Sequence, residues 1–363
     1  MTAHRPAVPG IFTGLPEGLG TSALRAFAGP ARLPADPGGL IRPPVFAMPY
    51  PARLNPHVAA ARERAAAWAA QTGLTGTGGV WSRKHFDVLD LALFTALAQP
   101  RLPLETLLLV GDWNVWAFAV DDHFLTYKAA GDEPGGQRFV ARLAACMPLD
   151  STPAPAPRHP VERALADVWT RTALTLPAGL RHRLREAALD FAAANLWELA
   201  NTKRGRIPDP VEYLQMRRRT AGTPLSTTLS LYAHGRNLPT QLLAHPTILA
   251  LIDAFADNVD LRNDLYSYRK ETELEKDHNN AVPVFQHFLN CSLQTAVDHV
   301  GNLMNARLEC FDRLVREELP KLTDEFGPDA YRTMAAYVDD LKDWTAGEHA
   351  WYPQTGRYTA GLD

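Results

Sequence analysis

The stretch from Leu107 to Lys128, LLLVGDWNVWAFAVDDHFLTYK, decides the fold. Drawn as a helix, it is apolar on almost every side, which is typical of a helix buried at the centre of a bundle. The apolar run ends at Asp121 and Asp122. Two like charges about 4 Å apart repel by roughly 4 kcal/mol at an effective dielectric constant near 20, so each carboxylate needs a cation or water. The pair therefore marks either a cation site or the point where the helix reaches solvent.

Helical periodicity continues along most of the chain, and period-two alternation between hairpin turns is nearly absent. Helices are predicted at residues 86–98, 103–130, 160–173, 178–202, 210–220, 224–234, 246–273, 279–289, 293–318 and 328–347. The connections are short, and no change in composition divides residues 47–363. We therefore predict an all-α fold with one domain over residues 47–363. Residues 1–46 are rich in Pro, Gly and Ala, so we expect a disordered or loosely docked extension there.

The composition favours a small-molecule ligand or a protein partner. Of the 363 residues, 46% are hydrophobic, which is enough to fill a sizeable core. The net charge of −3 provides no basic field for nucleic acid or an anionic membrane. No apolar run approaches the roughly 20 residues of a membrane helix, and the three cysteines follow no disulfide or zinc pattern. We predict a cytoplasmic protein that binds neither nucleic acid nor membrane.

A second set of polar side chains occurs in Asn263–Glu271, NDLYSYRKE, where Asn263, Ser267 and Glu271 recur every four residues. On a helix, steps of four advance only about 40° around the axis, so the three oxygen-bearing side chains share one narrow stripe. The stripe is either a solvated face or a site for a hard cation. Together with the two aspartates, these oxygen donors suit Mg²⁺, which keeps several waters and recruits phosphate oxygens from a ligand.

Basic residues that suit a metal-bound diphosphate occur in two further places. In Glu212–Pro224, EYLQMRRRTAGTP, three arginines precede a Gly and a Pro that break or bend a helix. A broken helix can aim Arg217 inward, where its guanidinium binds phosphate through two N–H groups. Arg357 and Tyr358 follow a Gly-containing turn near the C-terminus, and they either close over the same site or belong to a solvated tail.

These pieces, in this order, make the chain resemble a bacterial class I terpene synthase. DDHFL stands for the aspartate-rich motif, RRRTAG for the diphosphate-sensor region, NDLYSYRKE for the metal triad and RY for the C-terminal pair. The match spans residues 47–359. More closely, MPYPARLNPH, DDHFL, LWELAN and RNDLYSY resemble the germacradienol-forming N-terminal half of geosmin synthase and single-domain sesquiterpene synthases. Leu125 and Thr126 depart from the pattern, because an acid often completes the aspartate-rich motif there.

The resemblance implies a single-domain α-helical bundle around a central apolar cavity, with three Mg²⁺ ions. It implies that Asn263, Ser267 and Glu271 bind one ion and that Asp121 helps to bind the others, whereas Asp122 either binds metal or orients arginines. The implied diphosphate-binding residues are Arg217, Lys270, Arg357 and Tyr358. The residues expected to line the cavity are Phe118, Trp113, Trp116, Ala221, Trp344 and Trp351, although aromatic residues on buried helices are usually plain core.

The expected reaction is the Mg²⁺-dependent ionisation of farnesyl diphosphate, followed by cyclisation to a sesquiterpene hydrocarbon or alcohol. The residues expected to act in it are Asp121, Arg217, Phe118 and Tyr358. Two alternatives are a diterpene synthase acting on geranylgeranyl diphosphate and a catalytically silent isoprenoid-binding helical protein. A chain-elongating prenyl transferase would need a second aspartate-rich motif, and residues 253–271 offer Asn, Ser and Glu instead. Antiparallel homodimers are common among such enzymes, so a homodimer is allowed.

Overall fold

The computed structural model describes residues 41–150, 154–173, 175–236 and 238–359. Within these residues the chain is built from helices, and its only β-pairing is an isolated bridge between Thr75 and Trp81. The predicted all-α class is confirmed. The main helices are α2 (Val58–Thr72), α3 (Arg83–Leu89), α4 (Leu91–Ala98), α5 (Leu104–Ala130), α6 (Glu133–Ala145), α7 (Pro160–Ala173), α8 (Ala178–Arg204), α9 (Pro210–Thr220), α10 (Thr223–Ala233), α11 (Thr240–Leu243), α12 (Pro246–Arg269), α13 (Ala281–Leu289), α14 (Leu293–Arg313) and α15 (Leu322–Trp351).

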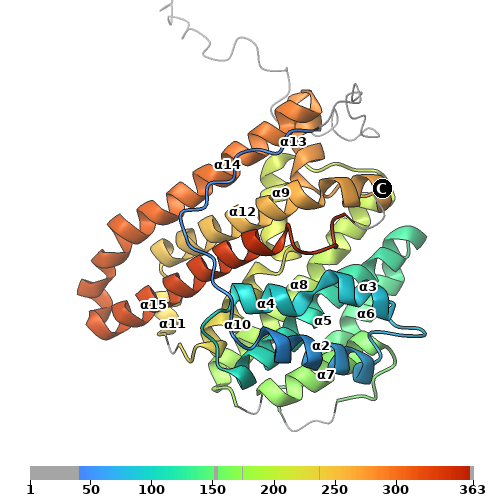
Figure 1. The fold of residues 1–363 in the computed structure, drawn as a ribbon, viewed down its shortest axis with the longest axis horizontal. Coiled ribbons are helices and arrows are strands. Elements are labelled where there is room, and N and C mark those ends of the chain that lie inside the picture. Colours follow the sequence, from blue (N-terminus) through green and yellow to red (C-terminus); the bar gives the residue numbers. More distant parts are fainter. Residues whose placement is uncertain (1–40, 151–153, 174, 237, 360–363) are drawn as a thin grey trace, which may run out of the picture.

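Two groups of helices pack together around the centre of the molecule. In one group α5 contacts α2, α4, α7 and α8, and in the other α12 contacts α9, α14 and α15. Figure 1 shows the first group in the lower half of the view and α12, α14 and α15 running side by side above it. The two groups meet where α15 packs on α4 and where α10 packs on α5, α8 and α15.

Helix α5 is buried as its sequence predicts. Trp113, Trp116 and Phe124 are 0% exposed, and burial of each such side chain contributes about 1.5–3 kcal/mol. The helix ends at Gly131, which adopts a left-handed conformation with φ of 60° and donates its N–H to the last carbonyls. This conformation is favourable for glycine and closes the C-terminus of the helix.

Two helices depart from regular α-helical geometry near residues that the sequence singled out. Gly222, with φ of 73°, separates α9 from α10, as the Gly and Pro near residue 222 predict. A Cβ at Gly222 would lie 3.1 Å from the Phe191 ring, so the close approach also requires glycine. After Arg269, α12 continues as a π-helical turn over Lys270–Leu274, a local widening that occurs often at functional sites.

The described part of the predicted N-terminal extension lies along α14. The backbone N–H of Arg42 donates to Gln294, and that of Ala47 donates to Asn305. Phe46 stacks on Tyr266 with ring centroids 5.3 Å apart. Figure 1 shows this segment in blue, crossing α14 and then descending toward α4. Residues 1–40 lie outside the described residues, and the domain boundary at residue 46 stays a prediction.

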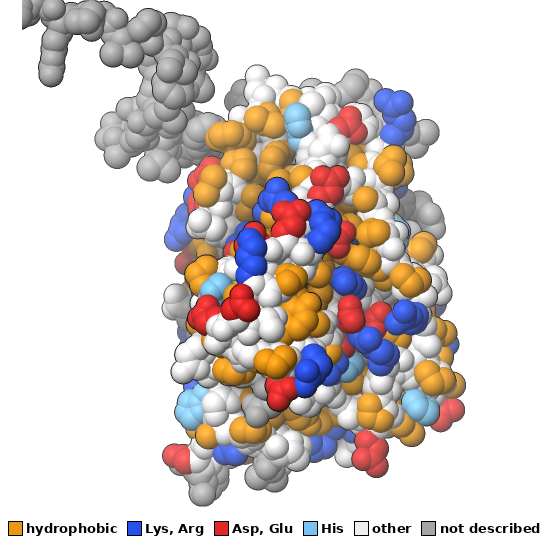
Figure 2. Space-filling view, turned by 90° about the vertical axis from the view of Figure 1, so that its left-hand side faces the viewer, with side chains coloured by type: hydrophobic (Ala, Val, Ile, Leu, Met, Phe, Trp, Pro, Cys, Tyr) orange, Lys and Arg blue, Asp and Glu red, His pale blue; other side chains and the backbone are white. Residues whose placement is uncertain are grey.

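The face shown in Figure 2 carries side chains of both charges. On the face in Figure 2, basic and acidic side chains are interspersed, as expected for a net charge of −3. Among the described residues, no helix is long and apolar enough to cross a membrane.

Candidate active site

A cavity opens between the two groups of helices, with about 1170 Å³ of space not filled by atoms, part of it open to solvent. Its walls come from α4, α5, α8, α9, α10, α12 and α15, from the π-helical turn and from the segment after α15. The cavity therefore takes its lining from both groups of helices.

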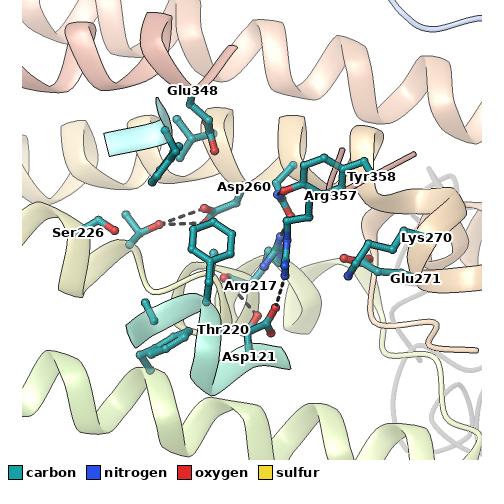
Figure 3. A pocket seen from close by; sticks show the side chains of 18 of the residues that line it. Asp121, Arg217, Thr220, Ser226, Asp260, Lys270, Glu271, Glu348, Arg357 and Tyr358 are labelled. Carbon is teal, nitrogen blue, oxygen red and sulfur yellow. Dashed lines mark hydrogen bonds and ion pairs between the residues drawn. The ribbon is translucent and has the colours of Figure 1, made fainter. Parts of the chain in front are cut away.

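One side of α5 faces this cavity. Its lining residues are Asn114, Ala117, Phe118, Asp121, Leu125 and Lys128. At about 100° per residue these positions fall within about 100° of arc. Asp121 therefore points into the cavity, where Figure 3 shows it below Arg357. Asp122 lies about 100° further around the helix and off the cavity surface.

Asp122 holds Arg357 in place. Its two carboxylate oxygens accept hydrogen bonds from the Arg357 guanidinium at 2.8 and 2.9 Å, and Oδ2 also accepts one from the indole of Trp81 at 2.6 Å. Burial alone would raise the pKa of the Asp122 carboxyl, but the adjacent guanidinium outweighs burial and lowers that pKa to about 2. Arg357 also donates to Asp121 at 3.2 Å. The geometry supports the alternative in which Asp122 orients an arginine.

Asn263 on α12 is the centre of a hydrogen-bonded group on the opposite wall. Its Oδ1 accepts a hydrogen bond from Arg217 at 2.7 Å, and its Nδ2 donates to the hydroxyls of Tyr352 and Tyr358 at 3.1 and 2.9 Å. Arg217 also donates to the buried carboxylate of Asp264 at 2.8 Å. The predicted diphosphate-binding residues Arg217 and Tyr358 therefore meet at one predicted metal ligand.

Glu271 reaches the cavity, whereas Ser267 lies behind its surface. Ser267 is 1% exposed. The amide nitrogen of Asn280 donates to the Glu271 carboxylate at 2.8 Å and to the Ser267 hydroxyl at 3.4 Å. Burial raises the pKa of the Glu271 carboxyl to about 7, and the nearby Lys270 acts in the opposite direction. Lys270 itself lines the cavity and pairs with Glu275 at 2.5 Å.

The donor chemistry of this site fits a divalent hard cation. In the described part of the chain, no three His, Cys, Asp or Glu side chains form a metal-binding group on their own. The cavity offers the carboxylates of Asp121 and Glu271 and the amide oxygen of Asn263. Each of these oxygens accepts an N–H from a neighbouring side chain, from Arg357, Asn280 and Arg217 respectively. Oxygen sets of this kind, completed by water and phosphate, are typical of Mg²⁺ sites.

The apolar wall is aromatic. Phe118, Trp344 and Trp351 line the cavity, and they pack around Phe94 with ring centroids 5.0–5.8 Å apart. Ala221 lines it at the end of α9. The guanidinium carbon of Arg357 lies 4.8 Å from the centroid of the Phe118 ring. That ring face therefore already accepts a cation.

The prediction that Trp113 and Trp116 line the cavity is wrong. On α5, Trp116 lies about 160° and Trp113 about 100° from Asn114, so neither belongs to the stripe that faces the cavity. Trp113 instead donates to Thr172 of α7 at 2.9 Å. Trp116 packs behind Phe191, which is a lining residue. Both tryptophans are core.

Several charged residues of the cavity were missed from the sequence. Lys128 pairs with Glu198 at 2.8 Å and with Asp277 at 2.6 Å at one end of the cavity. Asp260 and Glu348 line another part of it, and Figure 3 shows them away from Lys270 and Glu271. The sequence contained a hint of two of these residues. Lys128 lies seven residues after Asp121, and Asp260 lies three residues before Asn263. Both spacings place the two residues on the same side of a helix.

Comparison with known proteins decides what kind of site this is. A family model described as "Terpene synthase family 2, C-terminal metal binding" matches residues 112–309, more than half of the chain. The chain belongs to this terpene synthase family. The matched region contains α5 from the Asp112 position onward, α9, α12 and the π-helical turn, which together carry the predicted metal ligands.

Individual relatives agree with the family. Pristinol synthase of Streptomyces pristinaespiralis is 31% identical over 90% of this chain and 87% of its own length. The 4-epi-cubebol synthase of Streptosporangium roseum, described as cyclizing (2E,6E)-farnesyl diphosphate, is 28% identical over 94% of this chain and 96% of its own length. The crystal structure of linalool/nerolidol synthase from Streptomyces clavuligerus superposes with a TM-score of 0.74 at 26% identity, covering 85% of this chain and all of that one. This terpene synthase is thus a cyclase that acts on an isoprenoid diphosphate and binds a divalent metal.

Proposed function

We propose that the protein is a Mg²⁺-dependent sesquiterpene synthase that ionises farnesyl diphosphate and cyclises the resulting cation. The observation that carries this proposal is the shared cavity: Asp121 on α5 and Asn263 and Glu271 on the α12 side open into the same aromatic-lined space. The choice of a C15 substrate is supported by the 4-epi-cubebol synthase relative, whose name states farnesyl diphosphate.

Asp121, Asn263, Ser267 and Glu271 would hold the metal, and we propose three Mg²⁺ ions as the family resemblance implies. When bound, Mg²⁺ neutralises negative charge that develops on the leaving diphosphate. Ser267 sits behind the Asn280 amide, so we expect that amide to move aside when the site is loaded. Asp122 keeps Arg357 directed at the diphosphate end of the cavity.

Arg217, Lys270, Arg357 and Tyr358 would bind the diphosphate. Each now contacts a group of the protein: Asp264 and Asn263 for Arg217, Glu275 for Lys270, Asp122 for Arg357 and Asn263 for Tyr358. These contacts hold the donors close to their working positions before substrate arrives. Pre-arranged donors aimed at developing charge account for most of the rate enhancement in many enzymes. The allylic C–O bond can then break without a protein nucleophile.

The aromatic wall would stabilise the carbocation after ionisation. Each aromatic face contributes about 0.5–2 kcal/mol to a desolvated cation. Phe118 lies at the boundary between the diphosphate end and the apolar end, because it contacts Arg357 on one side and Phe94 and Trp351 on the other. Trp344 continues the wall beyond Phe94, and Trp351 packs between Phe94 and Tyr358.

The proposal has two further parts that come from composition and family resemblance. We place the enzyme in the cytoplasm, without nucleic-acid or membrane partners, and we expect it to work as a monomer or an antiparallel homodimer. Geranylgeranyl diphosphate is the second candidate substrate.

The direct test is incubation with geranyl, farnesyl and geranylgeranyl diphosphate and Mg²⁺, with diphosphate release and mass spectrometry of the extract as readouts. We expect diphosphate release and a cyclic C15 product with farnesyl diphosphate. Asp121→Ala should abolish turnover, whereas Asp190→Asn should not, because Asp190 pairs with Arg219 outside the cavity. Absence of diphosphate release with all three substrates would show a silent binding protein instead.

A further inference from the structure

A carboxyl group with no partner of opposite charge lies in the part of the cavity away from the predicted metal ligands on the π-helical turn. Asp260 is on α12, one turn before Asn263; it is 4% exposed and lines the cavity. The hydroxyl of Thr223 lies 3.1 and 3.3 Å from its two oxygens. In Figure 3, Asp260, Ser226 and Glu348 lie on one side of the Arg357–Asp121 pair, and Lys270 and Glu271 lie on the other.

The surroundings of Asp260 favour its neutral form. In the ranges that the structure describes, no Lys, Arg or His nitrogen is paired with its carboxyl group, whereas Glu348 accepts a hydrogen bond from Tyr352 and lies 3.5 Å from Arg262. Burial raises the pKa of the Asp260 carboxyl well above its usual range, and Arg217 offsets this only in part. Burial and the lack of a paired cation therefore both favour the protonated form of this carboxyl group.

A neutral carboxyl suits this location chemically. The same cavity is lined by Phe255, Val259 and Trp344, so a hydrocarbon held there would present its double bonds to Asp260. An ionised carboxylate in the same place would have no proton to give to such a double bond. A carboxylic acid instead has an O–H that it can donate, and Thr223 fixes the direction of the group. Positioned proton donors typically contribute about 10²–10⁴-fold to a rate.

We infer that Asp260 is a catalytic acid and base that protonates a neutral cyclic olefin inside the cavity and later takes a proton back. The inference rests on the proposed function, because that reaction supplies the olefin: the first cyclised cation loses a proton to the released diphosphate. The Asp260 O–H bond then breaks, and the electrons of one C=C bond form the new C–H bond. The neighbouring carbon becomes the cation, and Asp260 becomes a carboxylate.

The second half of the cycle restores the enzyme. After further ring closure, a C–H bond next to the final cation breaks, its electrons form the C=C bond of the product, and the proton returns to the Asp260 carboxylate. No oxidant or reductant is needed. Because the carboxyl proton exchanges with solvent between turnovers, the product gains one hydrogen from water. In D₂O this hydrogen is deuterium, which separates a catalytic role of Asp260 from a structural one. If the Asp260–Thr223 hydrogen bond only connected α12 to α10, the product would contain no deuterium.

The experiment uses the full-length protein with farnesyl diphosphate and Mg²⁺ in D₂O, and measures diphosphate release together with the mass of the product. We expect the product of the unmodified protein to be one mass unit heavier than in H₂O. Diphosphate release with an unlabelled product would overturn the inference and leave the proposed function intact. Absence of diphosphate release would overturn both.

Variants assign the proton to its residue. Asp260→Asn keeps the size of the side chain and a hydrogen-bond partner for Thr223, and it should lower the deuterated share of the product about hundredfold, in favour of an unlabelled, less cyclised olefin. Thr223→Val should lower that share less. Asp257→Asn is the matched control, because Asp257 lies one turn earlier on α12 and pairs with Arg218 and Arg307 outside the cavity. Persistence of the label in Asp260→Asn would overturn the assignment.

Discussion

Asp122→Asn separates two roles that adjacent carboxylates on one helix can have. In the structure Asp122 contacts Arg357 and Trp81 and lies off the cavity surface, whereas Asp121 faces the cavity. We therefore expect the variant to lose stability and diphosphate binding while it keeps its metal requirement. If Asp122 were a metal ligand, the metal requirement would change first.

The stability loss can be worked out from the contacts. The Arg357 guanidinium makes two hydrogen bonds to Asp122 and one to Asp121, and its side chain is 4% exposed. An amide accepts only one of the two bonds, and a hydrogen bond to a charged group contributes about 1.5–3 kcal/mol. The lowered pKa of Asp122, about 2 against an ordinary 3.8, gives a similar figure of roughly 2 kcal/mol. Because the folded pKa is depressed, this contribution is complete above pH 3.8 and is lost as the pH falls toward 2.

The assay is urea unfolding at pH 7 followed by steady-state kinetics with farnesyl diphosphate. We expect Asp122→Asn to lower the free energy of unfolding by about 2–3 kcal/mol. We expect its kcat/KM to fall about ten- to hundredfold, because Arg357 is less well positioned, and its half-saturating Mg²⁺ concentration to stay within about twofold. Asp121→Asn is the matched control. Because Asp121 is a proposed metal ligand, this variant should raise the Mg²⁺ requirement. Because the Asp121 side chain is 44% exposed, the variant should have little effect on stability. The reasoning is refuted if Asp122→Asn raises the Mg²⁺ requirement as Asp121→Asn does and leaves unfolding unchanged.

Three further expectations follow from the site. Trp116→Ala should lower the free energy of unfolding by about 3–5 kcal/mol, because the side chain is fully buried behind Phe191; an urea midpoint equal to that of the unmodified protein would contradict the core assignment. Phe118→Leu should change the product mixture more than the consumption of substrate, as gas chromatography would show; an unchanged mixture would remove Phe118 from the cation's path. Removal of divalent metal with EDTA should abolish diphosphate release, and excess Mg²⁺ should restore it; undiminished turnover in EDTA would exclude the metal.

Much of the fold could be predicted because helical periodicity is a local property of the sequence. The extent of α5 and the break before α10 were predicted correctly. Residues 86–98, predicted as one helix, form α3 and α4 with a break at Asp90, which adopts φ of 44° and accepts a hydrogen bond from the Leu93 N–H. An aspartate in that conformation has no signature in the pattern of apolar residues.

Helix α6 was missed because EPGG near its start is typical of a turn. In the structure Asp132 caps this helix by accepting the N–H of Gly135, and Pro134 occupies an early position where it costs no hydrogen bond. Gly136 allows α6 to approach α8 closely, since a Cβ there would lie 3.0 Å from Leu196. The need for that glycine comes from tertiary packing, which a single sequence does not display.

The candidate site could be predicted where the residues belong to a local motif. Asp121, Asn263 and Glu271 lie on the cavity wall, and a local pattern in the sequence pointed to each of them. Asp260 and Glu348 were missed, since their importance depends on which faces of α12 and α15 point into the cavity. Likewise, Trp113 and Trp116 lie on the faces of α5 that point into the core.

The central claim is that oxygen ligands on α5 and on the α12 side hold one metal-bound diphosphate over an aromatic cavity. A crystal soaked with Mn²⁺ and inorganic pyrophosphate tests it most directly, because anomalous scattering locates the metal independently of any assay. The account predicts anomalous peaks at coordination distance from Asp121 and from Asn263 and Glu271, with the pyrophosphate in contact with Arg217 and Arg357. Metal bound only outside this cavity, or pyrophosphate held away from both arginines, would contradict it.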